Sequence, residues 1–254
     1  LEIDINNVEA LSNLGQALSK MGQLTKAMTA LRRAVLCRPN DARLLNNLGN
    51  IEQTLGLLEY ANQTFEQALK IDPKCKLAER NILINTLNLP HQSAESLFEV
   101  HELYGEKYNR KNIAADKFAD RNKDINRKLR VGYLSSDFHS HPVGYNVLPL
   151  ISNHDTSEVE IFIYSECDIN DEVSNQFRYH ADHWYKTTDQ SDAQVANKIT
   201  DDEIDILVSL AGRFNLNRPT VTTFRTAPIQ ISYHDCATSG LTEMDYWLTD
   251  TSLH

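Results

Sequence analysis

The sequence lacks the features that mark membrane, secreted and zinc-binding proteins. It has no stretch of about 18 apolar residues for a membrane helix, and the opening LEIDINNVEA has neither the basic start nor the apolar core of a signal peptide. Its four cysteines stand far apart with no CxxC pair, which disfavours a disulfide framework and a zinc site. We therefore expect a cytoplasmic protein without membrane contact. Because the chain starts without methionine, we also expect the natural protein to be longer.

The sequence also has fewer basic than acidic residues. The 254 residues carry 25 Lys+Arg against 35 Asp+Glu, and 41% hydrophobic residues can fill one or two cores. Residues 1–90 are nearly neutral, with 10 basic and 9 acidic residues, whereas residues 91–254 hold 15 against 26. Such a surface repels polyanions, and no glycine-rich phosphate loop is present, so we expect no nucleic-acid partner.

The first part of the chain repeats itself with a period of 34 residues. Aligning residues 8–41 with 42–75 matches eight small, large or turn-forming positions: Leu11/Leu45, Leu14/Leu48, Gly15/Gly49, Gly22/Gly56, Ala27/Ala61, Leu31/Phe65, Ala34/Ala68 and Pro39/Pro73. This is the pattern of tetratricopeptide helix pairs. Small residues let the paired helices approach, large residues fill the space between them, and Gly22 forms the turn. Residues 76–88 predict one further helix, which ends near Pro90.

Stacked repeats of this kind form a concave surface that binds peptides, so we expect protein or peptide partners. A spacer or a homodimer contact is the alternative for the same residues. About three repeats are normally needed for a stable stack, so further repeats are expected upstream.

The hydrophobic period changes after residue 90. Residues 93–108 predict a connector helix capped by Ser93, on which His101 is a surface or packed histidine, and a polar loop follows to residue 127. Beyond it, short apolar runs predict strands at 129–135, 159–165, 205–211, 228–234 and 245–250. Helices are predicted between them at 144–152, 173–180, 191–200 and 218–225. This alternation predicts a Rossmann-like lobe with a parallel sheet over residues 128–254, after repeats over 1–90 and a connector over 91–127.

The strand at 129–135 leads directly into a group of ionisable side chains. Asp137, His139 and His141 follow it within a polar turn. Because open α/β sheets place their sites at the carboxyl ends of strands, this turn is a candidate site. A strand followed by an ordinary polar loop is the alternative.

Five segments of this half of the chain resemble one enzyme family. KLRVGYLSSDFHSHPVGY, DDEIDILVSLAG, TAPIQISY, ATSG and MDYWLTD, in this order, are similar to the amino-terminal half of the catalytic region of O-GlcNAc transferase and SPINDLY proteins. Those proteins also carry tetratricopeptide repeats directly upstream. The resemblance implies half of a GT-B fold and an inverting, metal-independent transfer of a sugar to Ser or Thr of proteins. The donor it implies is a nucleotide sugar, UDP-GlcNAc, and no cofactor is implied.

The resemblance also implies particular site residues. The family's DFxxHP histidine falls on His141, followed by Pro142, at the sugar and acceptor side of the cleft. An imidazole there can accept a hydroxyl proton or orient the reactants. The family's aspartate before the IxILV strand falls on Asp202, a second catalytic candidate, although Asp201 and Glu203 are adjacent.

His139 and Pro142 are substrate-binding candidates in the same loop. For Asp137, turn capping is an equal alternative. Although the HSH at 139–141 offers two imidazoles, their spacing and the lack of an identified carboxylate partner argue against a metal.

Two loops depart from the family pattern. Relatives have GHT or GYT facing the donor sugar where this chain has Gly212, Arg213 and Phe214. Relatives also carry a WLGYPGTSG-like loop, for which residues 233–240 are one residue shorter and lack the glycine and proline. We expect Arg213, His234, Thr238 and Ser239 to contact substrate in these loops. The departures predict a different donor or weakened activity.

In this family a second lobe binds the nucleotide and stabilises the departing diphosphate. The printed sequence stops before that lobe, so residues 1–254 are predicted to be inactive alone. A non-catalytic interaction protein, with repeats on a decayed transferase lobe, is the alternative function.

Overall fold

The computed structural model describes residues 5–110, 117–214, 216–235 and 237–249. The chain packs as two compact units, Leu1–Leu97 and Phe98–His254. Because the second unit begins inside the predicted connector helix, most of that helix belongs to the same unit as the sheet. Within the described residues, no helix has the length and apolar character needed to cross a membrane.

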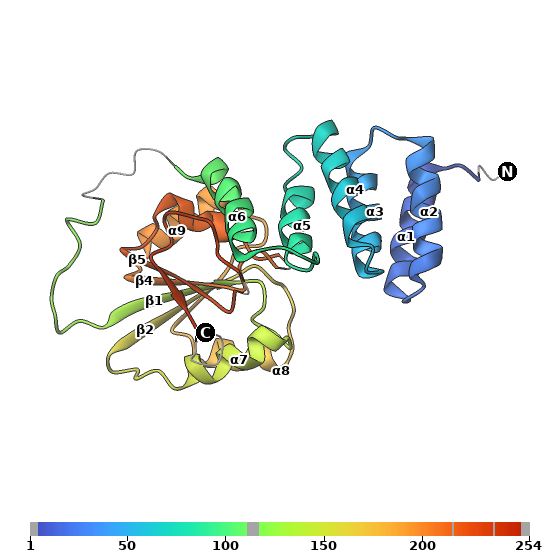
Figure 1. Cartoon of the computed structure of the whole chain (residues 1–254). Coiled ribbons are helices and arrows are strands. Elements are labelled where there is room, and N and C mark those ends of the chain that lie inside the picture. Colours follow the sequence, from blue (N-terminus) through green and yellow to red (C-terminus); the bar gives the residue numbers. More distant parts are fainter. Residues whose placement is uncertain (1–4, 111–116, 215, 236, 250–254) are drawn as a thin grey trace. The chain divides into compact units, whose positions relative to one another are not determined.

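The first unit contains two pairs of helices and one further helix, as the 34-residue period and residues 76–88 predict (Figure 1). They are α1 (Val8–Lys20), α2 (Leu24–Cys37), α3 (Ala42–Thr54), α4 (Leu58–Ile71) and α5 (Lys76–Thr86). Asn7 and Asp41 cap α1 and α3, because their side-chain oxygens accept hydrogen bonds from first-turn amides. Gly22 and Gly56 have φ angles of 73° and 76° at the turns within each pair, which confirms the turn position of Gly22.

Close helix contacts explain the small residues of the repeat. A Cβ at Gly15 would lie 2.6 Å from Cγ of Leu31, and a Cβ at Gly49 would lie 2.5 Å from Cε1 of Phe65. These distances confirm that each glycine lets the paired helix approach. Leu14, in contrast, is 49% exposed, because no described helix precedes α1, whereas its equivalent Leu48 is buried in the same cluster as Leu31.

The second unit contains a six-stranded parallel sheet in the order β3-β2-β1-β4-β5-β6. Its strands are β1 (Leu129–Ser135), β2 (Val159–Ser165), β3 (His183–Lys186), β4 (Ile206–Leu210), β5 (Ile229–Tyr233) and β6 (Tyr246–Leu248). The helices are α6 (Ala94–Tyr108), α7 (Pro142–Ser152), α8 (Glu172–His180) and α9 (Asp192–Asp201), with a 3₁₀ helix, η1 (Pro219–Phe224). Parallel strands joined by helices confirm the predicted Rossmann-like lobe.

Helices cover both faces of the sheet (Figure 1). On one face, α7 and α8 bury Val147, Ile151 and Phe177 with Val131 and Tyr133 of β1. On the other face, α9 and η1 form a separate core with the sheet. The members of that core include Leu134, Ile199, Leu207 and Val221. Leu207 of β4 enters this core, whereas its neighbours Ile206 and Val208 enter the first one, which explains the consecutive apolar residues at 206–208.

Two elements differ from those predicted. Strand β3, a short edge strand, was not predicted, and the helix predicted at 218–225 is the 3₁₀ helix η1 over Pro219–Phe224. In η1 the hydroxyls of Thr222 and Thr223 donate to the carbonyl oxygens of Pro219 and Thr220, three residues earlier. Local bonds of this kind, together with β-branched side chains, disfavour a longer α-helix here.

Candidate functional site

The strand order identifies one edge of the sheet as the place for a site. From β1 the chain proceeds through β2 and β3 to one side, and then through β4, β5 and β6 to the other. The direction of winding therefore reverses between β1 and β4. Open α/β sheets bind ligands outside the carboxyl ends of the strands at such a switch point. The loops that follow β1, β4 and β5 meet this edge, and they contain most of the predicted site residues.

A buried polar network links the loops after β1 and β4. The Asp137 side chain is 1% exposed, and its carboxylate accepts hydrogen bonds from Nδ2 of Asn217 at 2.8 Å and from Oγ of Ser136 at 2.9 Å. Oδ1 of Asn217 in turn accepts from the Ser136 amide and from Oγ of Ser135. Asn217 thereby joins the two loops across the switch point. Sequence reasoning missed it, because an asparagine between Leu216 and Arg218 carries no motif.

His141 stands at the amino end of α7 and caps it. Its Nδ1 accepts a hydrogen bond from the Val143 amide at 3.3 Å, and Pro142 supplies the first helical residue. The imidazole is 29% exposed, and its Nδ1 lies 3.9 Å from Oδ1 of Asp137. The structure thus places His141 at the switch point, beside a buried carboxylate.

The rest of the loop after β1 is tightly packed. The ring centroid of His139 lies 5.6 Å from that of His141, and the neighbouring Ser140 amide donates to Asp171 of the α8 cap. A Cβ at Gly144 would lie 2.2 Å from the carbonyl oxygen of His139, so only glycine lets the loop fold onto α7. The imidazole rings of His139 and His141 therefore lie side by side in this loop. Among the residues that the structure describes, no group of three or more His, Cys, Asp or Glu is placed to hold a metal.

Arg213 does not occupy the position expected for a donor-facing residue. It is only 5% exposed, and its guanidinium donates to the carbonyl oxygens of Thr238 and Ser239. The same group stacks on the ring of Tyr104 in α6, 4.3 Å from the ring centroid. Arg213 therefore holds the loop after β5 against α6, and its expected substrate contact stays a prediction.

The backbone is strained where the chain leaves β4 and β5. Ala211 and His234 have φ angles of 59° and 58°, which non-glycine residues rarely adopt. Gly212 follows Ala211 with φ of 51°, and a Cβ there would lie 2.2 Å from the carboxylate of Asp235. Strained residues of this kind concentrate at functional sites, and both lie at the carboxyl edge of the sheet.

His234 lines a small pocket at this edge, of about 270 Å³, with Leu150 of α7 and Tyr233. Burial lowers the pKa of His234, so its imidazole is held neutral near pH 7. Thr238 and Ser239 instead line a pocket of about 440 Å³ beside α6 and β6. Their hydroxyls accept hydrogen bonds from the amides of Gly240 and Leu241, so both also shape their own loop. The predicted residues of this loop therefore divide between two pockets.

Asp202 lies at the opposite edge of the sheet. It caps the carboxyl end of α9, just before β4 begins, and its carbonyl oxygen accepts a hydrogen bond from Arg130 near the start of β1. Its carboxylate accepts from Tyr164 at 2.7 Å and from Lys198 at 2.5 Å. These contacts hold α9 against the sheet. The structure does not bring Asp202 to His141, and its predicted catalytic role has no geometric support at this edge.

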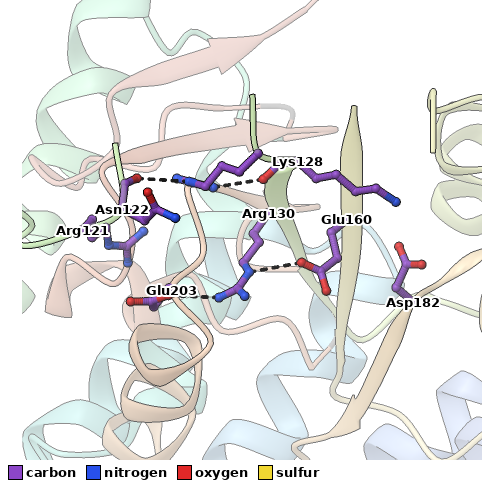
Figure 2. Close-up of a pocket in the computed structure, with 8 residues that line it drawn as sticks. Arg121, Asn122, Lys128, Arg130, Glu160, Asp182 and Glu203 are labelled. Carbon is purple, nitrogen blue, oxygen red and sulfur yellow. Dashed lines mark hydrogen bonds and ion pairs between the residues drawn. The ribbon is translucent and has the colours of Figure 1, made fainter. Parts of the chain in front are cut away.

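A charged pocket of about 370 Å³ lies at the same amino edge (Figure 2). Arg130 crosses it and pairs with Glu160 and Glu203, each at 3.1 Å. The other residues that line the pocket are Arg121, Asn122, Arg127, Lys128 and Asp182. Because ligands of open α/β sheets bind at the carboxyl ends of strands, we interpret this pocket as a structural ion-pair network.

Asp205 accepts hydrogen bonds within this network, and it makes the free energy of unfolding of the second unit depend on pH. Its carboxylate accepts two hydrogen bonds from Arg127, both at 2.6 Å, and one from the Arg130 amide at 2.9 Å. Burial raises the pKa of Asp205, but these bonds outweigh burial and hold the pKa below its ordinary value.

We expect Asp205→Asn to lower the free energy of unfolding of the second unit by about 2 kcal/mol at pH 7. The folded-state pKa is depressed, so this stabilisation is complete above the unfolded-state pKa of about 4 and is lost as pH falls through the folded value. Urea unfolding at pH 7 and pH 3 measures the difference. Asp168→Asn, in an exposed pair with Lys186, is the control. An equal loss from Asp205→Asn at both pH values would contradict the assignment.

Comparison with known proteins identifies the family of this chain. Residues 87–253 match the family described as glycosyl transferase family 41, and residues 8–41 and 42–75 each match a tetratricopeptide repeat. This chain belongs to glycosyl transferase family 41. The match confirms the predicted family and, with the observed elements, the predicted fold class of helical repeats followed by a parallel-sheet lobe of GT-B type.

The family 41 relatives are longer than this chain. It is 29% identical over 188 residues to a probable UDP-N-acetylglucosamine–peptide N-acetylglucosaminyltransferase SPINDLY of Petunia hybrida, an alignment covering 72% of this chain and 20% of the relative. It is 34% identical over 142 residues to the UDP-N-acetylglucosamine–peptide N-acetylglucosaminyltransferase of Caenorhabditis elegans, covering 54% and 12%. A solved mutant O-GlcNAc transferase of Thermobaculum terrenum matches with a TM-score of 0.87 and 28% identity, covering 99% of this chain and 48% of that one.

Proposed function

We propose that this chain is the repeat region and acceptor-side lobe of a protein O-glycosyltransferase of family 41. In this proposal the whole protein transfers N-acetylglucosamine from UDP-GlcNAc to Ser or Thr hydroxyls of protein acceptors, which the repeats bind. The transfer is inverting and needs neither a metal nor a cofactor. The names of the Petunia hybrida and Caenorhabditis elegans relatives support this choice of donor sugar and of a peptide acceptor.

The observation that carries the proposal is the position of His141. It is partly exposed at the switch point, where an α/β sheet binds its ligands, and Asp137 lies buried behind it. The Val143 amide orients the His141 ring through Nδ1, and the His139 ring lies beside it. The strained residues Ala211 and His234 support a site at the same edge.

The test is transfer of radiolabelled sugar by the whole protein with a panel of nucleotide sugars. We expect transfer from UDP-GlcNAc, and we expect His141→Ala to lower kcat by at least about 100-fold. His180→Ala is the matched control, because His180 ends α8 just before β3 and therefore lies toward the amino edge of the sheet. Equal activity of wild type and His141→Ala would remove His141 from the mechanism.

A non-catalytic interaction protein is the second candidate, favoured by the altered loops after β4 and β5. No transfer from any donor by the whole protein would reject the transferase and leave this alternative standing. We further propose that residues 1–254 alone are inactive, because stabilisation of the departing diphosphate falls to the second lobe implied by the family resemblance. Assaying the 254-residue chain beside the whole protein tests this point.

A further inference from the structure

Nδ1 of His141 faces two groups that require opposite states of the ring. The Val143 amide lies 3.3 Å away and can only donate, so it needs an unprotonated Nδ1. Oδ1 of Asp137 lies 3.9 Å away and can only accept while it is ionised, so it would need a proton on Nδ1. In a neutral imidazole only one of these bonds can form. Because a neutral ring carries one proton, the protonation of Nδ1 decides whether Nε2 accepts a hydrogen bond from a substrate or donates one to it.

The distances favour the bond from the helix. A separation of 3.3 Å is within the range of a weak hydrogen bond, whereas 3.9 Å is beyond it. The Asp137 carboxylate is also held by other donors, since Asn217 binds Oδ2 and Ser136 binds Oδ1. This network keeps the carboxylate from moving toward the ring.

We propose that neutral His141 carries its ring proton on Nε2, and that in the reaction it is a hydrogen-bond donor to a substrate oxygen instead of the base that accepts the hydroxyl proton. The part of this proposal that concerns substrate rests on the proposed transferase function. Asp137 and Asn217 are positioning residues in this arrangement. A neutral histidine at a helix amino terminus serves as an electrophile in triosephosphate isomerase, which shows that the chemistry is available to a protein.

The tautomer can be measured without substrate. Ring ¹⁵N and ¹H correlation spectra of the labelled 254-residue chain, at an alkaline pH where imidazoles are neutral, distinguish protonated Nε2 from protonated Nδ1. The His141 signals are those that disappear in His141→Gln. We expect a protonated Nε2 and an unprotonated Nδ1. A protonated Nδ1, or a ring averaged between both tautomers, would overturn the proposal.

The second arm compares His141→Gln with His141→Glu in the whole protein. Gln places an N–H donor near the position of Nε2, whereas Glu places a base there. A donor role predicts that His141→Gln retains at least about 10-fold more kcat than His141→Glu, since one donor to developing charge contributes about 10²- to 10³-fold. Thermal unfolding of both variants measures any loss of stability from repulsion between the introduced carboxylate and Asp137, and the kcat comparison is made at a temperature where both are folded.

The two arms separate the possible failures. A wild-type protein that transfers no sugar would reject the proposed function, while the tautomer would still be decided by the spectra. An active wild type in which His141→Glu equals or exceeds His141→Gln would leave the function standing and reject the donor role.

Discussion

Arg218→Met is expected to lower the free energy of unfolding of the second unit by about 3 kcal/mol or more. Arg218 lies just before η1 and donates to Oε1 of Glu166, 2.7 Å away. Glu166 directly follows the carboxyl end of β2. The Glu166 side chain is only 4% exposed, and Thr187 is its other donor. Removing the arginine leaves a buried carboxylate without its counter-charge, and breaking a buried pair in this way costs about 3–5 kcal/mol.

Tryptophan fluorescence during urea unfolding measures this effect in the correct unit, because both tryptophans, Trp184 and Trp247, lie in the second unit. The control is Lys186→Met, which removes an ion pair exposed on both sides and should cost less than about 1 kcal/mol. Adding Glu166→Gln to Arg218→Met should restore part of the stability, since no buried charge then remains. A loss below about 1 kcal/mol for Arg218→Met would show that Glu166 does not depend on it.

Gly105→Ala is expected to destabilise the second unit by about 4 kcal/mol, against the usual effect of this change. Replacing glycine by alanine inside a helix normally stabilises it by about 0.5–1 kcal/mol. In α6, however, a Cβ at Gly105 would lie 1.5 Å from the carbonyl oxygen of Gly240. The obstacle is backbone, so no rotamer change relieves it. Gly240, with φ of 64°, is itself packed so closely that a Cβ there would lie 1.9 Å from the His101 carbonyl oxygen, so the loop and α6 meet backbone to backbone.

Glu106→Ala is the matched control, because this neighbouring residue of α6 is exposed and the change keeps helix propensity high. Urea unfolding followed by tryptophan fluorescence measures both variants, and hydrogen exchange of the α6 amides reports whether the helix detaches. If Gly105→Ala kept the wild-type free energy of unfolding and the wild-type hydrogen exchange of α6, close packing of α6 against the loop after β5 would be contradicted.

Local patterns predicted much of the second unit. Strands β1 and β2 have the predicted ends, because each is a short, mainly apolar segment bounded by polar residues. Strand β3 was missed because its sequence, HWYK, has no apolar run, and its residues are half-buried or exposed at the sheet edge. It is defined by pairing with β2, and a local pattern does not contain that information.

The candidate site could also be predicted only in part from local patterns. The loop after β1 could be located because a strand leads directly into His141 and its neighbours. The direction of the Arg213 side chain could not, because its partners are Tyr104 and the carbonyls of residues 238 and 239, all distant in sequence. Asn217 and Asp202 illustrate the same limit, since their roles follow from which loop and which sheet edge surround them.

Arg213 connects the loops after β4 and β5, because its guanidinium donates to the carbonyl oxygens of Thr238 and Ser239. A substitution at Arg213 therefore also releases the loop after β5 from α6. The two loops form one structural unit, so a variant that exchanges one of them has to exchange the other as well.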